Sequence, residues 1–353
     1  MGVGGYCHTM TEFSGVTPGL VCSHHHLYSA LARGMPAPRR TPERFLQILE
    51  RVWWRLDAAL DLDMLEWSAK LGAVEALMSG CTAIIDHHES PNAIDGSLSI
   101  IADACAEVGV RVNCAYGVTD RHGPEGAIAG LAENERFLRE GGRGMVGIHA
   151  AFTCSETTLD EAIGLAQDLG VGVHVHVAEG VVDSGSGTAL ARKAEANWLL
   201  VHGVHLPDGI DLAGTVVHNP RSNMNNGVGY AQPTRFRAPV ALGTDGIGAD
   251  MLEEFRLAFA KHREVDVTAS PETAWTWLET GWDLFPEARD DVVSWNVPTM
   301  EPWHLAYTTG VRALDIVVDG EPVLLDGLPT RVDLDEVRAK AAEQAGRLFA
   351  RLA

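Results

Sequence analysis

The sequence predicts an α/β fold, a (β/α)8 TIM barrel with a reduced small β subdomain from the C-terminal region. Short β-branched runs alternate with longer Ala-, Leu- and Glu-rich stretches of helical period, which is typical of βα units around a parallel sheet. There are eight such runs, and eight parallel strands close a barrel. The predicted strands end near Ser23, Asp86, Tyr116, Ala150, Val177, Gly203, Asn219 and Asp245.

Two regions depart from the βα repeat. The connection between the first two strands is much longer than the others and contains FLQILERVWWRLDAAL (residues 45–60). We expect this helix-like insertion to cover the barrel mouth as a lid or to contact a partner. Near the end of the chain, Asp319-Gly320 is a hairpin dipeptide between two apolar runs, and a charged amphipathic helix is predicted over residues 333–352.

These boundaries predict three parts. Residues 1–17 are a short N-terminal remnant of the β subdomain, residues 18–289 form the barrel, and residues 290–353 form the hairpin and the C-terminal helix. Residues 251–263 are predicted to form a helix after the last barrel strand. The stretch Ser184-Gly-Ser-Gly187 matches no phosphate-binding motif and is predicted to be a loop.

Composition excludes several classes of protein. The chain has 353 residues, of which 46% are hydrophobic and 21% charged, so it is neither disordered nor fibrous. The formal net charge of −21 would repel nucleic acid and anionic membranes, and neither is expected as a partner. Six scattered cysteines without a C-x-x-C pair, and no signal-peptide pattern, indicate a cytoplasmic protein.

Histidines and carboxylates fall at the predicted strand ends, where TIM barrels carry their reactive residues. Side chains alternate along a strand, so His24 and His26 share one face of the first strand while His25 points away. A converging set of imidazoles and a carboxylate is suited to Zn or Fe(II). This predicted set comprises His24, His26, His176, His202 and Asp245.

Other histidines have a structural alternative. A single strand histidine is more often a hydrogen-bonded core residue than a metal ligand, and we interpret His174 and His218 in this way. His87 and His88 follow the second strand and either line the pocket or cap a loop. Trp53 and Trp54 either stack on a planar ligand or anchor the insertion, and packing is the favoured interpretation.

Five segments carry motifs in a characteristic order: PGLVCSHHHLYSALARG (residues 18–34), HVHVAE (174–179), LLVHGVHL (199–206), HNPRSNMNN (218–226) and LGTDG (242–246). They resemble the signatures of the metal-dependent amidohydrolase superfamily, in its deaminase and chlorohydrolase branch. WWRLD (53–57), DHH (86–88), TDR (119–121) and GIGAD (246–250) are closer to the SsnA-type aminohydrolases than to guanine or cytosine deaminases.

The resemblance implies one divalent metal per subunit, with Zn favoured over Fe(II) and no further cofactor. Binuclear members use a carboxylated lysine at the fourth strand, and GIHAAFTCS (147–155) has none. By the same resemblance the metal ligands are His24, His26, His176 and Asp245. Glu179 matches the proton-shuttling glutamate, His202 the histidine that polarises the reacting group, and His149 a position that contacts substrate.

The expected function is hydrolysis of a carbon–nitrogen bond in an N-heterocycle, most simply deamination of a purine-, pterin- or triazine-like ring. Metal-activated water would attack, Asp245 would accept its proton, and Glu179 would protonate the ring. Arg121, Asn223 and His87 are candidate substrate contacts beside His149. The alternatives are ring opening of a cyclic amide and a noncatalytic metal- or ligand-binding barrel. Relatives often form dimers, and a homodimer is expected.

Overall fold

The computed structural model describes residues 15–353, and the first part of the predicted N-terminal remnant lies outside this range. Eight parallel strands form the barrel, which confirms the predicted fold class. They are β2 (Leu20–His26), β3 (Cys81–His88), β4 (Arg111–Tyr116), β5 (Val146–Ala150), β6 (Val173–Val177), β7 (Leu199–His202), β8 (Thr215–His218) and β9 (Val240–Leu242).

The barrel is closed by parallel pairing within two groups of strands and by two connections between these groups. Strands β2, β3 and β4 form one parallel group and β5 to β9 another. Isolated parallel bridges, Cys114 to Gly144 and Val118 to Ile148, join the two groups. The short strand β10 (Asp245–Gly246) follows β9 and pairs with β2, so the last barrel segment returns to the first.

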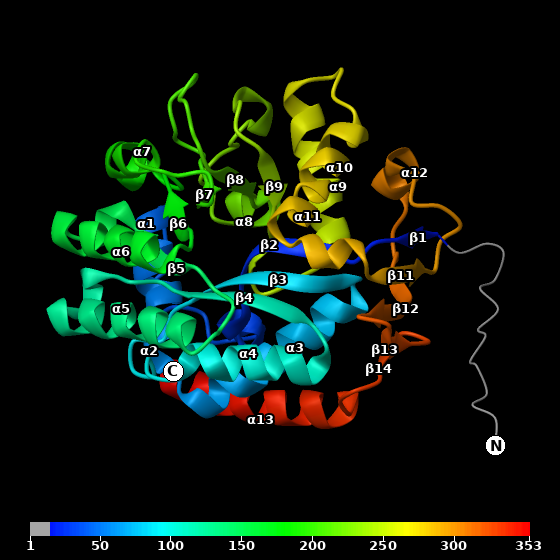
Figure 1. The fold of residues 1–353 in the computed structure, drawn as a ribbon, viewed down its shortest axis with the longest axis horizontal. Coiled ribbons are helices and arrows are strands. Elements are labelled where there is room, and N and C mark those ends of the chain that lie inside the picture. The colour runs from blue at the N-terminus through cyan, green and yellow to red at the C-terminus, as the bar shows by residue number, and fades with distance from the viewer. Residues whose placement is uncertain (1–14) are drawn as a thin grey trace.

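Helices surround the barrel (Figure 1). They are α3 (Leu62–Met78), α4 (Ser97–Val108), α5 (Pro124–Arg139), α6 (Glu156–Leu169), α7 (Ser184–Ala191), α8 (Pro220–Asn225), α9 (Met251–Val265), α10 (Pro271–Glu279) and α11 (Gly281–Leu284). Short single-turn helices lie in the connections: η1 (Leu27–Ala32), η3 (Asp120–His122), η4 (Ala151–Thr153), η5 (Val181–Asp183), η6 (Pro233–Arg235) and η7 (Pro286–Arg289). Helix α9 confirms the helix predicted over residues 251–263.

One local prediction was wrong. Ser184-Gly-Ser-Gly187 begins helix α7 instead of forming a loop. The preceding Asp183 explains this, because its carboxylate accepts hydrogen bonds from the Ser186 hydroxyl and from the Ala178 backbone N–H. These bonds fix the start of the helix despite the low helix propensity of Ser and Gly.

The insertion after β2 is helical, as predicted. It comprises α1 (Phe45–Ile48), a π-helical turn η2 (Leu49–Trp53) and α2 (Trp54–Ala59). Single π-turns within helices are rare and often occur at functional sites. We call residues 45–59 the lid, because five of its side chains line the cavity described below.

A five-stranded antiparallel sheet stands beside the barrel (Figure 1), in the order β1-β11-β12-β13-β14. Its strands are β1 (Val16–Thr17), β11 (Val292–Trp295), β12 (Ala313–Val318), β13 (Glu321–Leu325) and β14 (Leu328–Pro329), with α12 (Pro302–Tyr307) between β11 and β12. Asp319 and Gly320 have left-handed φ values of 53° and 80°, as the predicted hairpin turn requires. The domain boundaries at residues 17 and 289 stay a prediction.

The C-terminal helix α13 (Leu334–Leu352) supports the lid. It packs along α3 and also contacts α2 and η1 (Figure 1). Leu348 and Leu352 join a buried cluster with Leu56 and Leu60. Within the described part of the chain, no helix is both long and apolar enough to cross a membrane.

We predict that Leu348→Ala lowers the free energy of unfolding by about 2–5 kcal/mol, because Leu348 is fully buried between α13 and the base of the lid. Chemical denaturation followed by circular dichroism measures this change. Lys340→Ala, on the exposed face of the same helix, is the control and should change stability by less than about 0.5 kcal/mol. Equal effects of the two substitutions would contradict the packing role of α13.

Candidate metal and catalytic site

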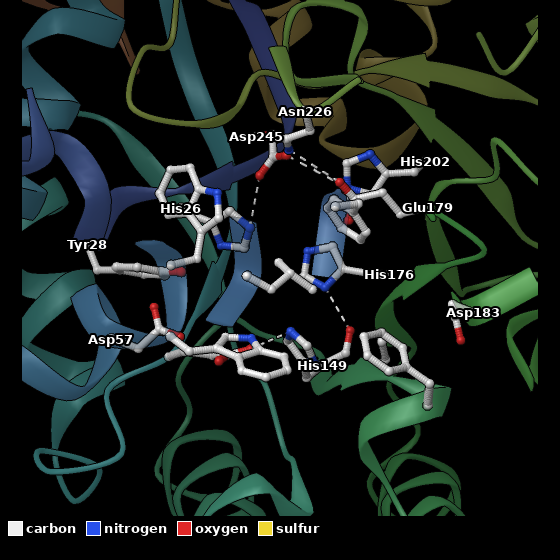
Figure 2. A pocket seen from close by; sticks show the side chains of 17 residues that line it. His26, Tyr28, Asp57, His149, His176, Glu179, Asp183, His202, Asn226 and Asp245 are labelled. Carbon is white, nitrogen blue, oxygen red and sulfur yellow. Dashed lines mark hydrogen bonds and ion pairs between the residues drawn. The ribbon is translucent and has the colours of Figure 1, made fainter. Parts of the chain in front are cut away.

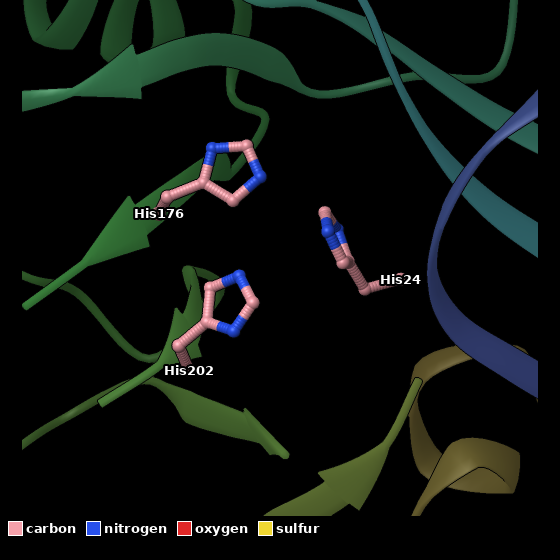
Figure 3. Close-up of side chains that lie close together, drawn as sticks. All are labelled: His24, His176 and His202. Carbon is pink, nitrogen blue, oxygen red and sulfur yellow. The ribbon is translucent and has the colours of Figure 1, made fainter. Parts of the chain in front are cut away.

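The predicted ligands converge at one end of the barrel. His24 and His26 come from β2, His176 from β6, His202 from β7 and Asp245 from β10. Their ligand atoms form overlapping groups in which all atoms lie within 4.8 Å of one another: His24 with His176 and His202, and His24 with His26 and Asp245. Figure 3 shows the three rings of the first group directed toward a common point from different strands.

Hydrogen bonds fix the orientation of these rings. Nδ1 of His176 donates to the carbonyl oxygen of His149 at 2.7 Å, and Nδ1 of His26 donates to the carbonyl oxygen of His87. Nδ1 of His24 contacts Nε2 of His174 at 2.9 Å. Each ring therefore directs Nε2 into the cluster, and such outer partners are usual for metal-ligating histidines.

The donor set fits a divalent metal. Nε2 of His24 is buried without a hydrogen-bond partner in the described structure, which is costly unless another group occupies the site. Its nearest carboxylate oxygen is Oδ1 of Asp245 at 3.7 Å, and Nε2 of His26 lies 3.1 Å from the same oxygen. Three imidazoles with one carboxylate are a ligand set that suits zinc.

Burial favours the ligating forms of these groups. Burial holds the pKa values of His24 and His176 well below the usual value, so both rings are neutral. Burial opposes ionisation of Asp245, but the neighbouring imidazoles of His24 and His26 outweigh it and keep the pKa of Asp245 well below its usual value. Burial also lowers the pKa of His26, but the Asp245 carboxylate raises it to about 9 overall. A metal ion would compete with that proton.

The backbone is constrained at the strand ends. Ala178, His202 and Asp245 have left-handed φ values of 47°, 74° and 59°. Residues with a Cβ rarely adopt this conformation, which costs about 1–3 kcal/mol and is concentrated at functional sites. Around Asp245, the guanidinium of Arg221 donates to the carbonyl oxygens of Thr244 and Gly246 at 2.8 and 3.0 Å.

Groups that are able to transfer protons adjoin the predicted ligand cluster. Glu179 Oε2 lies 3.5 Å from His202 Nε2, and the Ser222 hydroxyl donates to Asp245 Oδ2. Burial raises the pKa of Glu179 to about 7, which suits a residue that gives and takes protons at neutral pH. His202 Nδ1 donates to Asn223 Oδ1 at 2.8 Å, which directs Nε2 toward the cluster.

The cavity above these residues is lined in part by the lid. Figure 2 shows His26, His176, His202, Glu179 and Asp245 around it. The lid side chains that line it are Phe45, Leu49, Trp53, Trp54 and Asp57. The sequence favoured a packing role for Trp53 and Trp54. In the structure both residues also line the cavity.

Two glycines allow the lid to approach Glu179 and Asp245. Gly180 follows Glu179, and a Cβ there would lie 2.4 Å from Phe45 Cδ1. Gly246 follows Asp245, and a Cβ there would lie 2.8 Å from the Trp53 ring. Contacts this close are not tolerated by a side chain, so glycine at both positions lets the lid rings rest on the loops that carry these carboxylates.

Of the four predicted substrate contacts, His149 lines the cavity. The other three lie behind the lining and hold residues of the site. Arg121 forms an ion pair with Glu89, Asn223 bonds His202, and His87 Nε2 donates to the carbonyl oxygen of Ile148 at 3.1 Å.

Sequence reasoning missed several lining residues: Tyr28, Asp57, Glu89 and Asp183. Glu89 directly follows β3, so the rule that reactive residues follow strand ends could have found it. Asp57 lies in the lid, and its position depends on tertiary packing.

Neither ring nitrogen of the buried His218 has a hydrogen-bond partner among the described residues, and no metal group includes it.

Comparisons with known proteins agree with this geometry. Residues 16–280 match the model of the Amidohydrolase family. The chain is 30% identical to the 5'-deoxyadenosine deaminase of Methanopyrus kandleri and 29% identical to the 5-methylthioadenosine/S-adenosylhomocysteine deaminase of Desulforudis audaxviator. Each alignment covers 94% of this chain and 86% of the relative.

Solved structures share the fold. An adenosine deaminase from Xanthomonas campestris with bound zinc gives a TM-score of 0.80 at 20% identity, covering 96% of this chain and 86% of that chain. The zinc-containing atrazine chlorohydrolase TrzN from Arthrobacter aurescens gives a TM-score of 0.76 at 19% identity. This alignment covers 94% of this chain and 88% of that chain.

The family match and the ligand cluster confirm the predicted enzyme class, a metal-dependent hydrolase of carbon–nitrogen bonds other than peptide bonds. The chain belongs to the Amidohydrolase family, in the superfamily's deaminase and chlorohydrolase branch.

Proposed function

We propose that this protein is a zinc-dependent aminohydrolase that replaces the exocyclic amine of an adenine-type ring by oxygen. The observation that carries the proposal is the grouping of Glu179, His202 and Asp245 within 4.8 Å, directly beside the histidine ligands. A site that only binds metal needs no such proton-transferring set. The adenine ring is inferred from the names of the deaminase relatives.

We propose His24, His26, His176 and Asp245 as the residues that hold the metal. A divalent metal held there would supply an activated water at neutral pH, because coordination lowers the pKa of water to about 7. Asp245, kept ionised by its histidine neighbours, would take up a proton from the attacking water.

Glu179 and His202 act on the ring. Glu179, with its pKa raised by burial to about 7, donates a proton to the ring nitrogen next to the reacting carbon, so negative charge does not build up there. The His202 ring, whose Nε2 lies 3.5 Å from Glu179 Oε2, polarises the oxygen that forms on that carbon. Asp245 then returns its proton to the amine, which leaves as ammonia, while the proton remaining on the new oxygen passes to Glu179.

Several finer predictions belong to this proposal. We still predict that the protein is of the SsnA type, that it forms a homodimer and that it is located in the cytoplasm. The roles assigned to the site residues are predictions as well. Ring opening of a cyclic amide by the same groups is the competing reaction. Release of ammonia from an adenine nucleoside separates the two, because ring opening retains the exocyclic nitrogen.

We predict that the purified protein binds one equivalent of zinc per chain and that His176→Ala binds less than a tenth of an equivalent, because it loses an imidazole ligand. Elemental analysis after dialysis measures the metal. The control is His304→Ala, an exposed residue of α12, which should bind like the unchanged protein. Full zinc occupancy in His176→Ala would exclude His176 as a ligand.

We also predict that Glu179→Gln keeps its zinc but loses about 10²–10⁴-fold in kcat for ammonia release, because the amide cannot transfer the proton. Steady-state assays with 5'-deoxyadenosine measure the loss. Glu161→Gln, on the exposed face of α6, should retain full activity. A Glu179→Gln protein that is as active as this control refutes the assigned role.

A further inference from the structure

One short helix contacts three residues of the candidate site. Helix α8 and the residue that follows it place polar side chains against Asp245, His202 and Glu179, which come from three different segments of the barrel. Figure 2 shows Asn226 on the side of the cavity that carries Asp245 and Glu179. The contacts are those of Ser222 with Asp245, Asn223 with His202, and Asn226 with Glu179. A displacement of α8 would therefore disturb all three contacts at once.

A buried carboxyl group fixes the start of α8. Glu254 lies in the first turn of α9, and its side chain is 0% exposed. Its Oε2 atom accepts a hydrogen bond from the backbone N–H of Arg221 at 3.1 Å, and its Oε1 atom accepts one from Nε of Arg221 at 2.9 Å. The first N–H groups of a helix have no partner within the helix, and Glu254 supplies one here. Arg221 is thus held through both its main chain and its side chain.

The same guanidinium holds the segment that carries Asp245. Asp245 and Ile247 have left-handed φ values of 59° and 82°. Such backbone is costly for residues with a Cβ and persists only where neighbouring groups hold it. Nη2 of Arg221 lies within hydrogen-bond distance of three carbonyl oxygens of this segment, those of Thr244, Gly246 and Gly248, at 2.8, 3.0 and 3.3 Å. Arg221 therefore ties α8 to the turn that carries Asp245.

Arg221 acts from outside the cavity. It is absent from the residues that line the cavity, so it is remote from the substrate in the proposed reaction. Burial raises the pKa of Glu254 to about 8, and the nearby Arg221 opposes that rise. The arrangement itself is fixed by hydrogen bonds, because each carboxyl oxygen of Glu254 has its own N–H donor. Loss of the guanidinium would remove one of these donors and would leave the three carbonyl oxygens without it.

We propose that Arg221 is a positioning residue, anchored by Glu254, that sets the orientation of Asp245 toward the metal and joins that segment to the contacts of α8. Arg221 itself belongs neither to the metal-ligand groups nor to the cavity lining. The inference rests on the proposed metal site, and only its turnover test rests on the proposed deamination.

Zinc affinity tests the role without turnover. We expect Arg221→Gln to bind zinc about 10–100-fold more weakly than the unchanged protein, because partners that orient metal ligands have effects of this size. Competition with a chromophoric zinc chelator measures Kd. The control is Arg263→Gln, whose guanidinium also bonds a backbone carbonyl, that of Ala269, but at the far end of α9, and which should leave Kd unchanged. A folded Arg221→Gln protein with an unchanged zinc Kd overturns the proposal.

Arg221→Lys is the second variant, and it keeps a donor for the buried Glu254 if Arg221→Gln does not fold. The ammonium group is a single point and cannot span a carboxyl group and three carbonyl oxygens as the planar guanidinium does. We expect its zinc affinity to lie between those of Arg221→Gln and the unchanged protein. An Arg221→Lys protein that binds zinc as tightly as the unchanged protein refutes the role of the guanidinium contacts.

A double-mutant cycle tests the anchor. In Glu254→Gln, an amide NH2 replaces one of the two acceptors of Arg221, so zinc affinity should fall. If Glu254 acts through Arg221, the double variant Arg221→Gln/Glu254→Gln should bind zinc no more weakly than Arg221→Gln alone. Losses of affinity that multiply in the double variant contradict this anchor.

Turnover separates positioning from substrate binding. With saturating zinc and 5'-deoxyadenosine, we expect Arg221→Gln to lower kcat about tenfold or more and to change KM by less than about threefold, because Arg221 does not line the cavity. A raised KM with unchanged kcat would place Arg221 in substrate binding and overturn its positioning role. If the unchanged protein releases no ammonia, the proposed deamination fails, and the zinc affinities still decide the role of Arg221.

Discussion

The candidate site depends on the closure of the barrel between its last and first segments. Strand β10 pairs with β2 so that Asp245 lies opposite His25 and Gly246 opposite His26. This register brings the carboxylate of the last barrel segment beside the two imidazoles of the first. Without it, the histidines of β2 and Asp245 would belong to opposite ends of an open sheet, and no ligand cluster would form.

A second layer of packing completes the cavity. The lid rests on Gly180 and Gly246, next to Glu179 and Asp245, and its base is held by α13. Arg347 and Arg351 of α13 pair with Asp61 just after the lid, at 2.7 and 2.6 Å. The C-terminal helix therefore contributes to the site indirectly, by positioning the segment that supplies Trp53, Trp54 and Asp57 to the cavity.

The sequence predicted the barrel, its eight strands and the converging ligands, because strand ends in a TIM barrel meet at one rim whatever the details of packing. It did not predict Asp57, since the position of a long insertion depends on tertiary contacts. Arg121 was expected to contact substrate, but its partners Glu89 and Asp57 come from separate segments, and their pairing appears only in three dimensions. The left-handed backbone at His202 and Asp245 leaves no compositional signal, because neither residue is glycine.

The proposed chemistry requires that His24, His26, His176 and Asp245 hold one zinc ion. Anomalous diffraction at the zinc edge, on a crystal of the zinc-loaded protein, locates that ion. We expect one strong peak at this cluster, about 2.0–2.1 Å from the Nε2 atoms of the three histidines and about 2.0–2.2 Å from an oxygen of Asp245. A zinc ion bound by other residues, with this cluster vacant, would contradict it.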